Sequence, residues 1–146
     1  MGRQITELRP STAGKALKFL RQCKAQKLDM IITCTWRSNE EQASLYAQGR
    51  TRSGRIVTNA KPGQSAHNCL GLRGEPASRA FDVVPLRGGK PIWGTSGNGI
   101  DADPTDDDTD DLEMWQRVGA VGKACGLGWA GDWRTFREFP HFEEEP

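Results

Sequence analysis

Histidine and long apolar runs are both scarce in this chain, which has two histidines among 146 residues. No stretch is long and apolar enough to cross a bilayer, so we expect no membrane insertion. The first residues also lack the apolar stretch of a secretory signal, which indicates synthesis in the cytoplasm without a signal peptide. With 36% hydrophobic and 27% charged residues, the sequence predicts a single domain over residues 1–146.

Cysteine is present, but the spacing shows no paired motif. The four cysteines are far apart and form no Cys-x-x-Cys pair: Cys23, Cys34, Cys69 and Cys125. Without a secretory signal we interpret them as free thiols, with Cys23 and Cys34 as small core residues. Cys69 lies two residues from a histidine and is an alternative soft metal ligand. We favour a carboxylate in that role, because a turn is predicted directly after Cys69.

Both histidines and one aspartate stand in settings that a zinc site requires. His67 lies in a Ser-Ala-His-Asn segment, His141 follows Glu-Phe-Pro, and Asp82 is embedded in the apolar run 80–85. Burying an unpaired carboxylate is costly, so Asp82 needs a partner. Two imidazoles and one carboxylate leave the fourth position of a tetrahedral zinc to water, which is the catalytic pattern.

Each of these residues also has an ordinary interpretation. A lone histidine is more often structural or exposed than a ligand, and an acid in a strand is more often a cross-strand partner. The combination favours a metal, because Glu138 stands three residues before His141 as a carboxylate that need not bind the ion. Metal-assisted hydrolysis needs such a group to accept a proton from water. The sequence therefore predicts a zinc hydrolase.

Five short segments together resemble one family of zinc peptidases. They are Trp36-Arg37-Ser38, 45–51, 56–60, 62–68 and 80–85. In combination they are similar to the L-alanyl-D-glutamate endopeptidases of bacteriophage endolysins. Those enzymes belong with the D-alanyl-D-alanine carboxypeptidases and vancomycin-resistance dipeptidases in a superfamily that shares its fold with the Hedgehog signalling domain. The resemblance covers most of the chain and implies lysis of peptidoglycan between L-alanine and D-glutamate.

The resemblance also implies roles for individual residues. His67, Asp82 and His141 would bind one Zn²⁺, and Glu138 would be the catalytic base. Arg37 would polarise the scissile carbonyl and bind substrate, and Ser65 would be a hydroxyl contacting either the substrate or a ligand. Two alternatives remain: a D-alanyl-D-alanine carboxypeptidase or dipeptidase, and a non-catalytic binding module in which zinc only holds the fold.

The resemblance further implies where such a protein works. We expect a monomer that acts on the cell wall after a separate holin-like or secretion partner has released it. One departure from the family lies between the first two ligands, which are further apart here than is common. Residues 69–78 between them read as an inserted loop, which costs little entropy if the flanking strands stay paired. Because such a loop would leave from the edge of the metal site, it bears on the shape of the cleft.

Charge is unevenly distributed, although the net charge is only +1. Residues 1–90 carry 16 basic and 6 acidic side chains, whereas residues 91–146 carry 4 and 13. The basic half suits an anionic polymer such as peptidoglycan, whose stem peptides carry free carboxylates. Nucleic acid is disfavoured, because the basic cluster 50–55 has no interleaved aromatic residues and no recognisable binding motif.

An acidic loop covers residues 101–111. Calcium is one possible ligand, but an EF-hand loop that began at Asp101 would have Asp106 and Leu112 where a glycine and a glutamate are needed. We therefore favour a solvated turn, in which the last carboxylates interact favourably with the positive N-terminal end of the next helix.

The pattern of elements predicts a small α+β domain. The first helix is expected to run from an N-cap at Ser11 or Thr12 to about Lys27, with Leu17 on its apolar face. A second helix should begin at the capping box in residues 38–41, and a third should cover residues 109–125. Strands are expected at 30–35, 80–85 and 139–143. They would form a largely antiparallel sheet with the helices on one face and the metal on the exposed face or edge, as in Hedgehog and D-alanyl-D-alanine peptidases. The ends, 1–10 and 143–146, are expected to be disordered.

Overall fold

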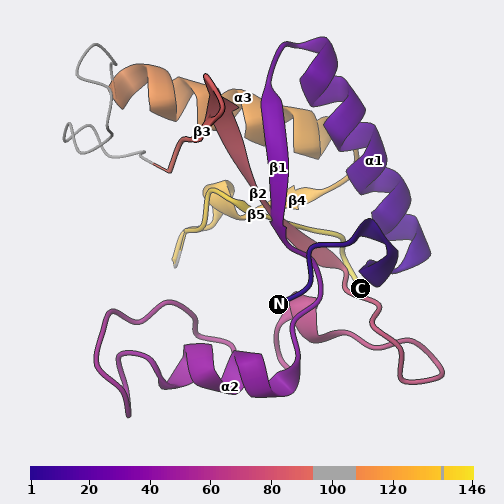
Figure 1. Cartoon of the computed structure of the whole chain (residues 1–146), viewed down its shortest axis with the longest axis vertical. Helices are drawn as coiled ribbons and strands as arrows, with labels where there is room; N and C mark the ends of the chain where they lie inside the picture. The colour runs from indigo at the N-terminus through magenta and orange to yellow at the C-terminus, as the bar shows by residue number, and fades with distance from the viewer. Residues whose placement is uncertain (94–107, 136) are drawn as a thin grey trace.

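The computed structural model describes residues 1–93, 108–135 and 137–146, which form helices around a small sheet (Figure 1). The α-helices are α1 Pro10–Ala25, α2 Asn39–Ala47 and α3 Asp108–Ala124, and short 3-10 helices lie at η1 Ile5–Glu7, η2 Ala66–Asn68 and η3 Ala130–Asp132. The strands are β1 Asp29–Cys34, β2 Ala80–Arg87, β3 Lys90–Pro91, β4 Gly128–Trp129 and β5 His141–Glu143. They pair antiparallel in the order β1-β2-β5-β4, with β3 beside β2. This arrangement confirms the predicted fold class.

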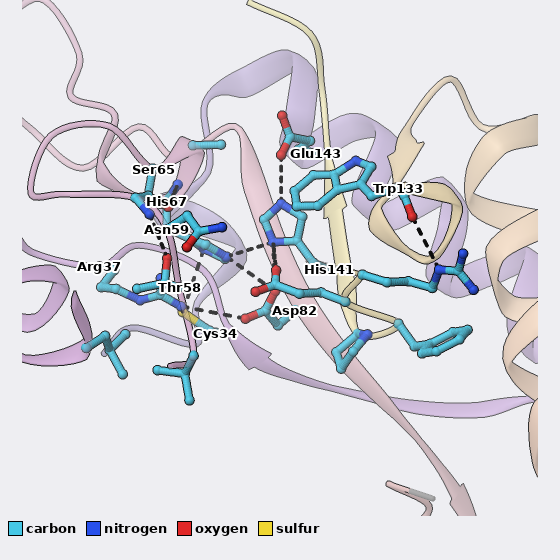
Figure 2. A pocket seen from close by; sticks show the side chains of 18 of the residues that line it. Cys34, Arg37, Thr58, Asn59, Ser65, His67, Asp82, Trp133, His141 and Glu143 are labelled. Carbon is cyan, nitrogen blue, oxygen red and sulfur yellow. Dashed lines mark hydrogen bonds and ion pairs between the residues drawn. The ribbon is translucent and has the colours of Figure 1, made fainter. Parts of the chain in front are cut away.

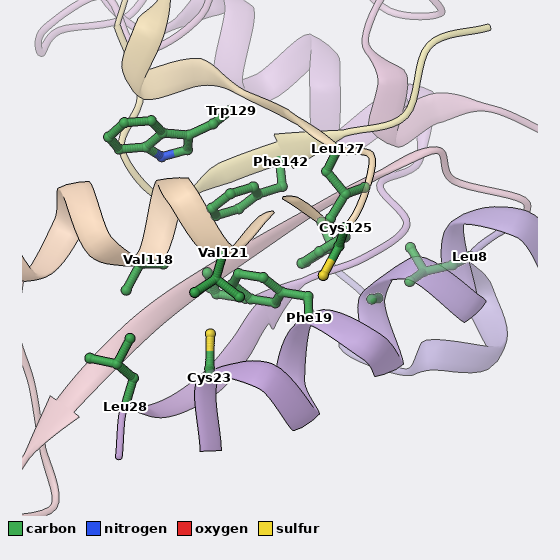
Figure 3. Packing of buried hydrophobic residues seen from close by; sticks show 13 residues of the cluster. Leu8, Phe19, Cys23, Leu28, Val118, Val121, Cys125, Leu127, Trp129 and Phe142 are labelled. Carbon is green, nitrogen blue, oxygen red and sulfur yellow. The ribbon is translucent and has the colours of Figure 1, made fainter. Parts of the chain in front are cut away.

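The core lies between one face of the sheet and the helices α1 and α3, while α2 lies apart beyond the end of β1 (Figures 1 and 3). Phe81 and Val83 of β2 and Phe142 of β5 point into this core. Phe19 of α1 packs on Phe142 with ring centroids 4.9 Å apart. Since side chains alternate along a strand, the residues between these apolar ones face the opposite side of the sheet.

Helix α3 approaches the sheet closely because it presents glycine at the contact. A Cβ atom built on Gly122 would lie 2.2 Å from a ring carbon of Phe142. Any side chain there would push α3 and β5 apart, because a packed core has no room for added atoms. Gly122 therefore helps to fix the position of β5, the strand on which His141 stands.

Helix α1 differs from its prediction at its start and on one face. Its N-cap is Arg9 and Pro10 occupies the first turn, so neither Ser11 nor Thr12 caps it. Proline suits that place, because the first N–H groups of a helix have no partner within it. Leu17 is 46% exposed, and the buried face of α1 runs instead through four residues: Thr12, Ala16, Phe19 and Cys23.

The C-terminal end is tied to α1, so its predicted disorder is wrong. Glu144 is 7% exposed, and its Oε1 accepts hydrogen bonds from Ser11 Oγ at 2.6 Å and Thr12 Oγ1 at 2.8 Å. Arg9 Nη2 lies 2.7 Å from the same carboxylate, which also pairs with Lys15. Burial by itself raises the pKa of Glu144, but these donors outweigh it and lower the pKa to about 2. The contact anchors the chain just after β5.

Replacing Glu144 by glutamine should destabilise the fold by about 2 kcal/mol at pH 7, because it removes charge-assisted bonds from a buried site. The pKa in the folded state is lowered from 4.5, so the contribution is complete above pH 4.5 and is lost as the pH falls toward 2. Urea unfolding of Glu144→Gln and wild type at several pH values measures this. The exposed neighbour Glu145→Gln is the control, and equal stability of Glu144→Gln and wild type at pH 7 would contradict the prediction.

Two further expectations meet the structure only in part. Among the described residues, no helix combines the length and the apolar character needed to cross a membrane. The acidic loop 101–111, which we expect to be a solvated turn with calcium binding as the less favoured alternative, falls largely on residues 94–107, outside the described part of the chain, and stays a prediction.

Candidate metal centre

Three neighbouring strands carry the candidate site on the face of the sheet that α1 and α3 leave uncovered. Asp82 of β2 pairs in register with His141 of β5 on one side and with Cys34 of β1 on the other. Because Phe81 and Val83 point into the core, Asp82 points away from it, and so does its partner His141. A register shift between Ile32 and Cys34 turns Cys34 to the same face, as a β-bulge does.

His67 reaches the same point from the short helix η2. Ser65 is the N-cap of η2, and its Oγ accepts a hydrogen bond from the His67 backbone N at 3.1 Å. The His67 side chain is 2% exposed. The Ser65 side chain therefore supports the histidine backbone, and Ser65 also lines the cleft described below.

The three predicted ligands converge on one point (Figure 2). His67 Nε2 lies 3.3 Å from Asp82 Oδ1 and 3.3 Å from His141 Nδ1, and His141 Nδ1 lies 3.2 Å from Asp82 Oδ1. In a tetrahedral zinc site with bonds of about 2.0–2.1 Å, two ligand atoms are separated by about 3.3 Å. The side chains therefore form a triangle of the size that a zinc ion fits, and we call it the ligand triangle.

Partners behind the ligand triangle fix which nitrogen of each histidine faces it. His67 Nδ1 lies 2.7 Å from the Thr35 carbonyl oxygen, to which it can only donate, so in the neutral imidazole the proton is held at Nδ1 and Nε2 is the nitrogen that can bind a metal. His141 Nε2 lies 2.8 Å from Glu143 Oε1, which leaves His141 Nδ1 as the acceptor. Carbonyls and carboxylates behind metal-binding histidines orient the rings in this way.

The pKa values of the cluster favour a positive charge at its centre. Burial alone lowers the pKa of His67, but the Asp82 carboxylate outweighs it and raises the pKa to about 10. Burial also disfavours the charged form of Asp82, yet the two imidazoles hold the pKa of Asp82 well below its usual range. A cation among these donors satisfies both tendencies.

Glu138 and Arg37 lie at the edge of the ligand triangle without belonging to it. Glu138 Oε2 is 3.8 Å from His141 Nδ1, and Arg37 Nη2 is 3.7 Å from Asp82 Oδ2. Burial raises the pKa of Glu138 above its ordinary value. Such a shift suits a carboxylate that takes up a proton and releases it again near neutral pH.

Arg37 is held by residues that the sequence did not single out. Gln42 of α2 is fully buried, and its Oε1 accepts from Arg37 Nη1 at 2.9 Å while its Nε2 donates to the Ala60 carbonyl at 2.8 Å. Asn68 Nδ2 donates to the Arg37 carbonyl at 2.8 Å. A capping box at Ser38 starts α2 as predicted and sets Gln42 one turn later. The capping box was visible in the sequence, but nothing in the sequence indicated that Gln42 would hold Arg37.

The cysteine beside the site is Cys34 and not Cys69. Cys34 Sγ lies 3.7 Å from His67 Nδ1, and it could contribute to a metal group with His67 and Asp82, whose ligand atoms all lie within 4.8 Å of one another. Its sulfur, however, faces the nitrogen of His67 that points away from the ligand triangle. Cys69 belongs to no such group among the described residues, and all four cysteines are free.

An open cleft of about 1170 Å³ runs across the ligand triangle. Thr58, Asn59 and Ser65 line one wall, and Trp133 lies beside His141, with ring centroids 5.4 Å apart, on another (Figure 2). Trp93 also lines the cleft, whereas Trp129 is buried in the core. The loop 69–78 contributes no residue to the lining, so its expected influence on the shape of the cleft is not borne out.

Comparisons with known proteins agree on one family. A family model described as D-alanyl-D-alanine carboxypeptidase matches residues 5–73, and a second with the same description matches residues 58–144. The peptidoglycan L-alanyl-D-glutamate endopeptidase CwlK of Bacillus subtilis (strain 168) is 37% identical over 120 residues, which is 82% of this chain and 62% of CwlK. The chain thus spans less than two thirds of that relative's length.

Solved structures share the fold of this chain. The L-Ala D-Glu endopeptidase ChiX of Serratia marcescens superposes with a TM-score of 0.63 at 16% identity, covering 97% of this chain and 83% of ChiX. A mutant of the vancomycin resistance D,D-pentapeptidase VanY, solved in complex with Zn(II), gives a TM-score of 0.57 at 13% identity, covering 94% of this chain and 72% of VanY. At these identities the likeness establishes the fold.

Proposed function

Because the chain belongs to the D-alanyl-D-alanine carboxypeptidase family, we propose that it is a zinc-dependent peptidoglycan hydrolase cleaving the L-alanyl-D-glutamate bond of the stem peptide. The observation that carries the proposal is the ligand triangle of His67, Asp82 and His141 with Glu138 beside it. The choice of bond rests on the identity to CwlK, whose name states that activity.

One Zn²⁺ is the metal we assign to the ligand triangle. Two imidazole nitrogens and one carboxylate oxygen are the donors that catalytic zinc uses, and the spacing of 3.2–3.3 Å fits them. When bound, zinc would polarise the scissile carbonyl and lower the pKa of a water molecule toward neutrality.

The protein's own groups supply the proton transfer and the charge stabilisation. Glu138 takes a proton from the attacking water and returns it to the leaving amine, since its carboxylate reaches the edge of the ligand triangle. The Arg37 guanidinium, fixed by Gln42, stabilises the negative charge that develops on the carbonyl oxygen. Ser65 holds the backbone of His67 and presents its hydroxyl to the substrate in the cleft.

Two other functions compete with this proposal. A D-alanyl-D-alanine carboxypeptidase, the activity that both family descriptions name, would use the same metal and base. A non-catalytic zinc module would have no need for Glu138 to stand at the open side of the ligand triangle with a raised pKa. The proposed site of action is the cell wall, with the stem peptide as the partner.

A defined muropeptide, N-acetylmuramyl-L-alanyl-D-glutamyl-diaminopimelyl-D-alanyl-D-alanine, distinguishes the two enzymes. We expect the zinc-loaded protein to release a tetrapeptide with a new N-terminal D-glutamate, detected by mass spectrometry. Release of free D-alanine with the L-alanyl-D-glutamate bond intact would instead make it the carboxypeptidase.

Replacing Gln42 by methionine should lower kcat by about tenfold while the zinc content stays at one per chain. Arg37 Nη1 would lose its hydrogen-bond acceptor, so the guanidinium would be held less firmly. A hydrogen bond to a charged group contributes about 1.5–3 kcal/mol, and its loss here would weaken the stabilisation of the transition state. Steady-state kinetics and metal analysis of the same preparation measure both quantities. Loss of zinc in Gln42→Met would contradict the positioning role, because Gln42 does not touch a proposed ligand.

A further inference from the structure

The cleft wall beside His141 carries two arginines that the proposed mechanism does not use. Arg134 and Arg137 lie between η3 and β5, are exposed, and line the cleft. Their neighbour Trp133 packs on His141, which puts this part of the chain next to the ligand triangle (Figure 2). A ligand held at the ligand triangle would therefore pass close to these cations.

Of the arginines that line the cleft, Arg134 is the one that has no partner among residues 1–93, 108–135 and 137–146. Arg37 is held by Gln42 and Asp82. Arg79 Nη1 lies 3.2 Å from Glu143 Oε2 and 2.9 Å from the Glu144 carbonyl. Arg137 Nε donates to the Trp133 carbonyl at 3.2 Å and so ties this wall together.

Arg134 makes no hydrogen bond and no ion pair within the described part of the chain. A guanidinium has five N–H donors in a fixed fork and pairs best with a carboxylate or phosphate. An unpartnered guanidinium on the wall of a cleft is thus available to an anionic group of the ligand.

The proposed substrate has such a group at the right place. The stem peptide continues from D-glutamate through its side-chain carboxyl, so the α-carboxylate of that residue stays free. This carboxylate is attached to the carbon that bears the scissile nitrogen, only two bonds from it. A scissile bond held at the ligand triangle therefore brings a negative charge into the cleft, two bonds from the scissile nitrogen.

We propose that Arg134 binds the free α-carboxylate of D-glutamate and makes the enzyme prefer a stem peptide with this carboxylate over one in which it is amidated. Arg137 positions Arg134 by holding the Trp133 carbonyl. The inference rests on the proposed function, since it names the part of the substrate that lies beyond the scissile bond.

Two muropeptides that differ only in the α-carboxylate or α-amide of the D-glutamyl residue test it. We expect the wild type to prefer the acid, with kcat/KM about 10- to 100-fold higher than for the amide. In Arg134→Gln the rate on the acid falls, mainly through KM, so that the ratio of the two substrates approaches one. Arg134→Lys should retain part of the preference, and the exposed Arg73→Gln, outside the cleft, should retain all of it.

The outcomes separate the two proposals. If the wild type cleaves the L-alanyl-D-glutamate bond but Arg134→Gln keeps the wild-type ratio, the carboxylate site is wrong and the proposed function stands. Equal rates of the wild type on both substrates would overturn the carboxylate site as well. If the wild type cuts neither substrate at this bond, the proposed function fails and the inference fails with it.

Discussion

Replacing Glu138 by glutamine is expected to lower kcat by about 10³-fold or more while zinc stays bound. The carboxylate stands 3.8 Å from His141 Nδ1, outside the ligand triangle, so its loss removes the proton acceptor and leaves the three donors in place. Positioned general bases contribute about 10²–10⁴-fold to rate, and glutamine has nearly the same shape. Kinetics on the defined muropeptide and zinc analysis of the same protein measure the two effects.

The control for this experiment is Glu113→Gln on the exposed side of α3, which removes the same charge from a residue that does not line the cleft. Its rate should equal that of the wild type. Near-normal turnover in Glu138→Gln would exclude the residue as the base. Loss of zinc as complete as in a ligand variant would make Glu138 a ligand instead.

Replacing His141 by alanine is expected to abolish both zinc binding and turnover. The residue supplies one of three donors, and two remaining donors are too few for a stable tetrahedral site. The loss of zinc affinity should exceed that in Glu143→Gln, because Glu143 contacts the far nitrogen of His141 and is not one of the three proposed ligands. Mutating a group behind a ligand typically costs about 10- to 100-fold in metal affinity.

Thermal unfolding with and without added zinc gives a second measure of the same effect. A metal that binds only the folded state stabilises it in proportion to the logarithm of its concentration over the dissociation constant. The melting temperature of the wild type should rise with zinc, that of Glu143→Gln should rise less, and that of His141→Ala should not change. A wild-type melting temperature independent of zinc would argue against a metal in the ligand triangle.

The sequence predicted the elements that carry the site because each has a strong local signal. Asp82 lies in a short apolar run that indicates a buried strand, and Ser38 with Glu41 forms a capping box that starts α2 as expected. The pairing of Asp82 with His141 could be guessed only from their resemblance to a known family, because strand register depends on contacts between distant segments.

What the sequence missed depends on tertiary contacts without a local pattern. A β-bulge turns Cys34 toward the site, although the apolar strand around it indicated a core position. Glu144 lies in a charged tail that looked disordered, yet four side chains of α1 and its N-cap bury it: Arg9, Ser11, Thr12 and Lys15. Gln42 holds Arg37 from a helix whose periodicity marked no polar residue as special.

Mass spectrometry of the fragments released from purified peptidoglycan tests the central claim most directly. Zinc-loaded protein, chelated protein and Glu138→Gln are incubated with the same wall preparation. We predict soluble peptides that begin with D-glutamate in the zinc-loaded sample alone. An intact wall in all three samples, or fragments that form equally after chelation, would contradict a zinc-dependent L-alanyl-D-glutamate endopeptidase.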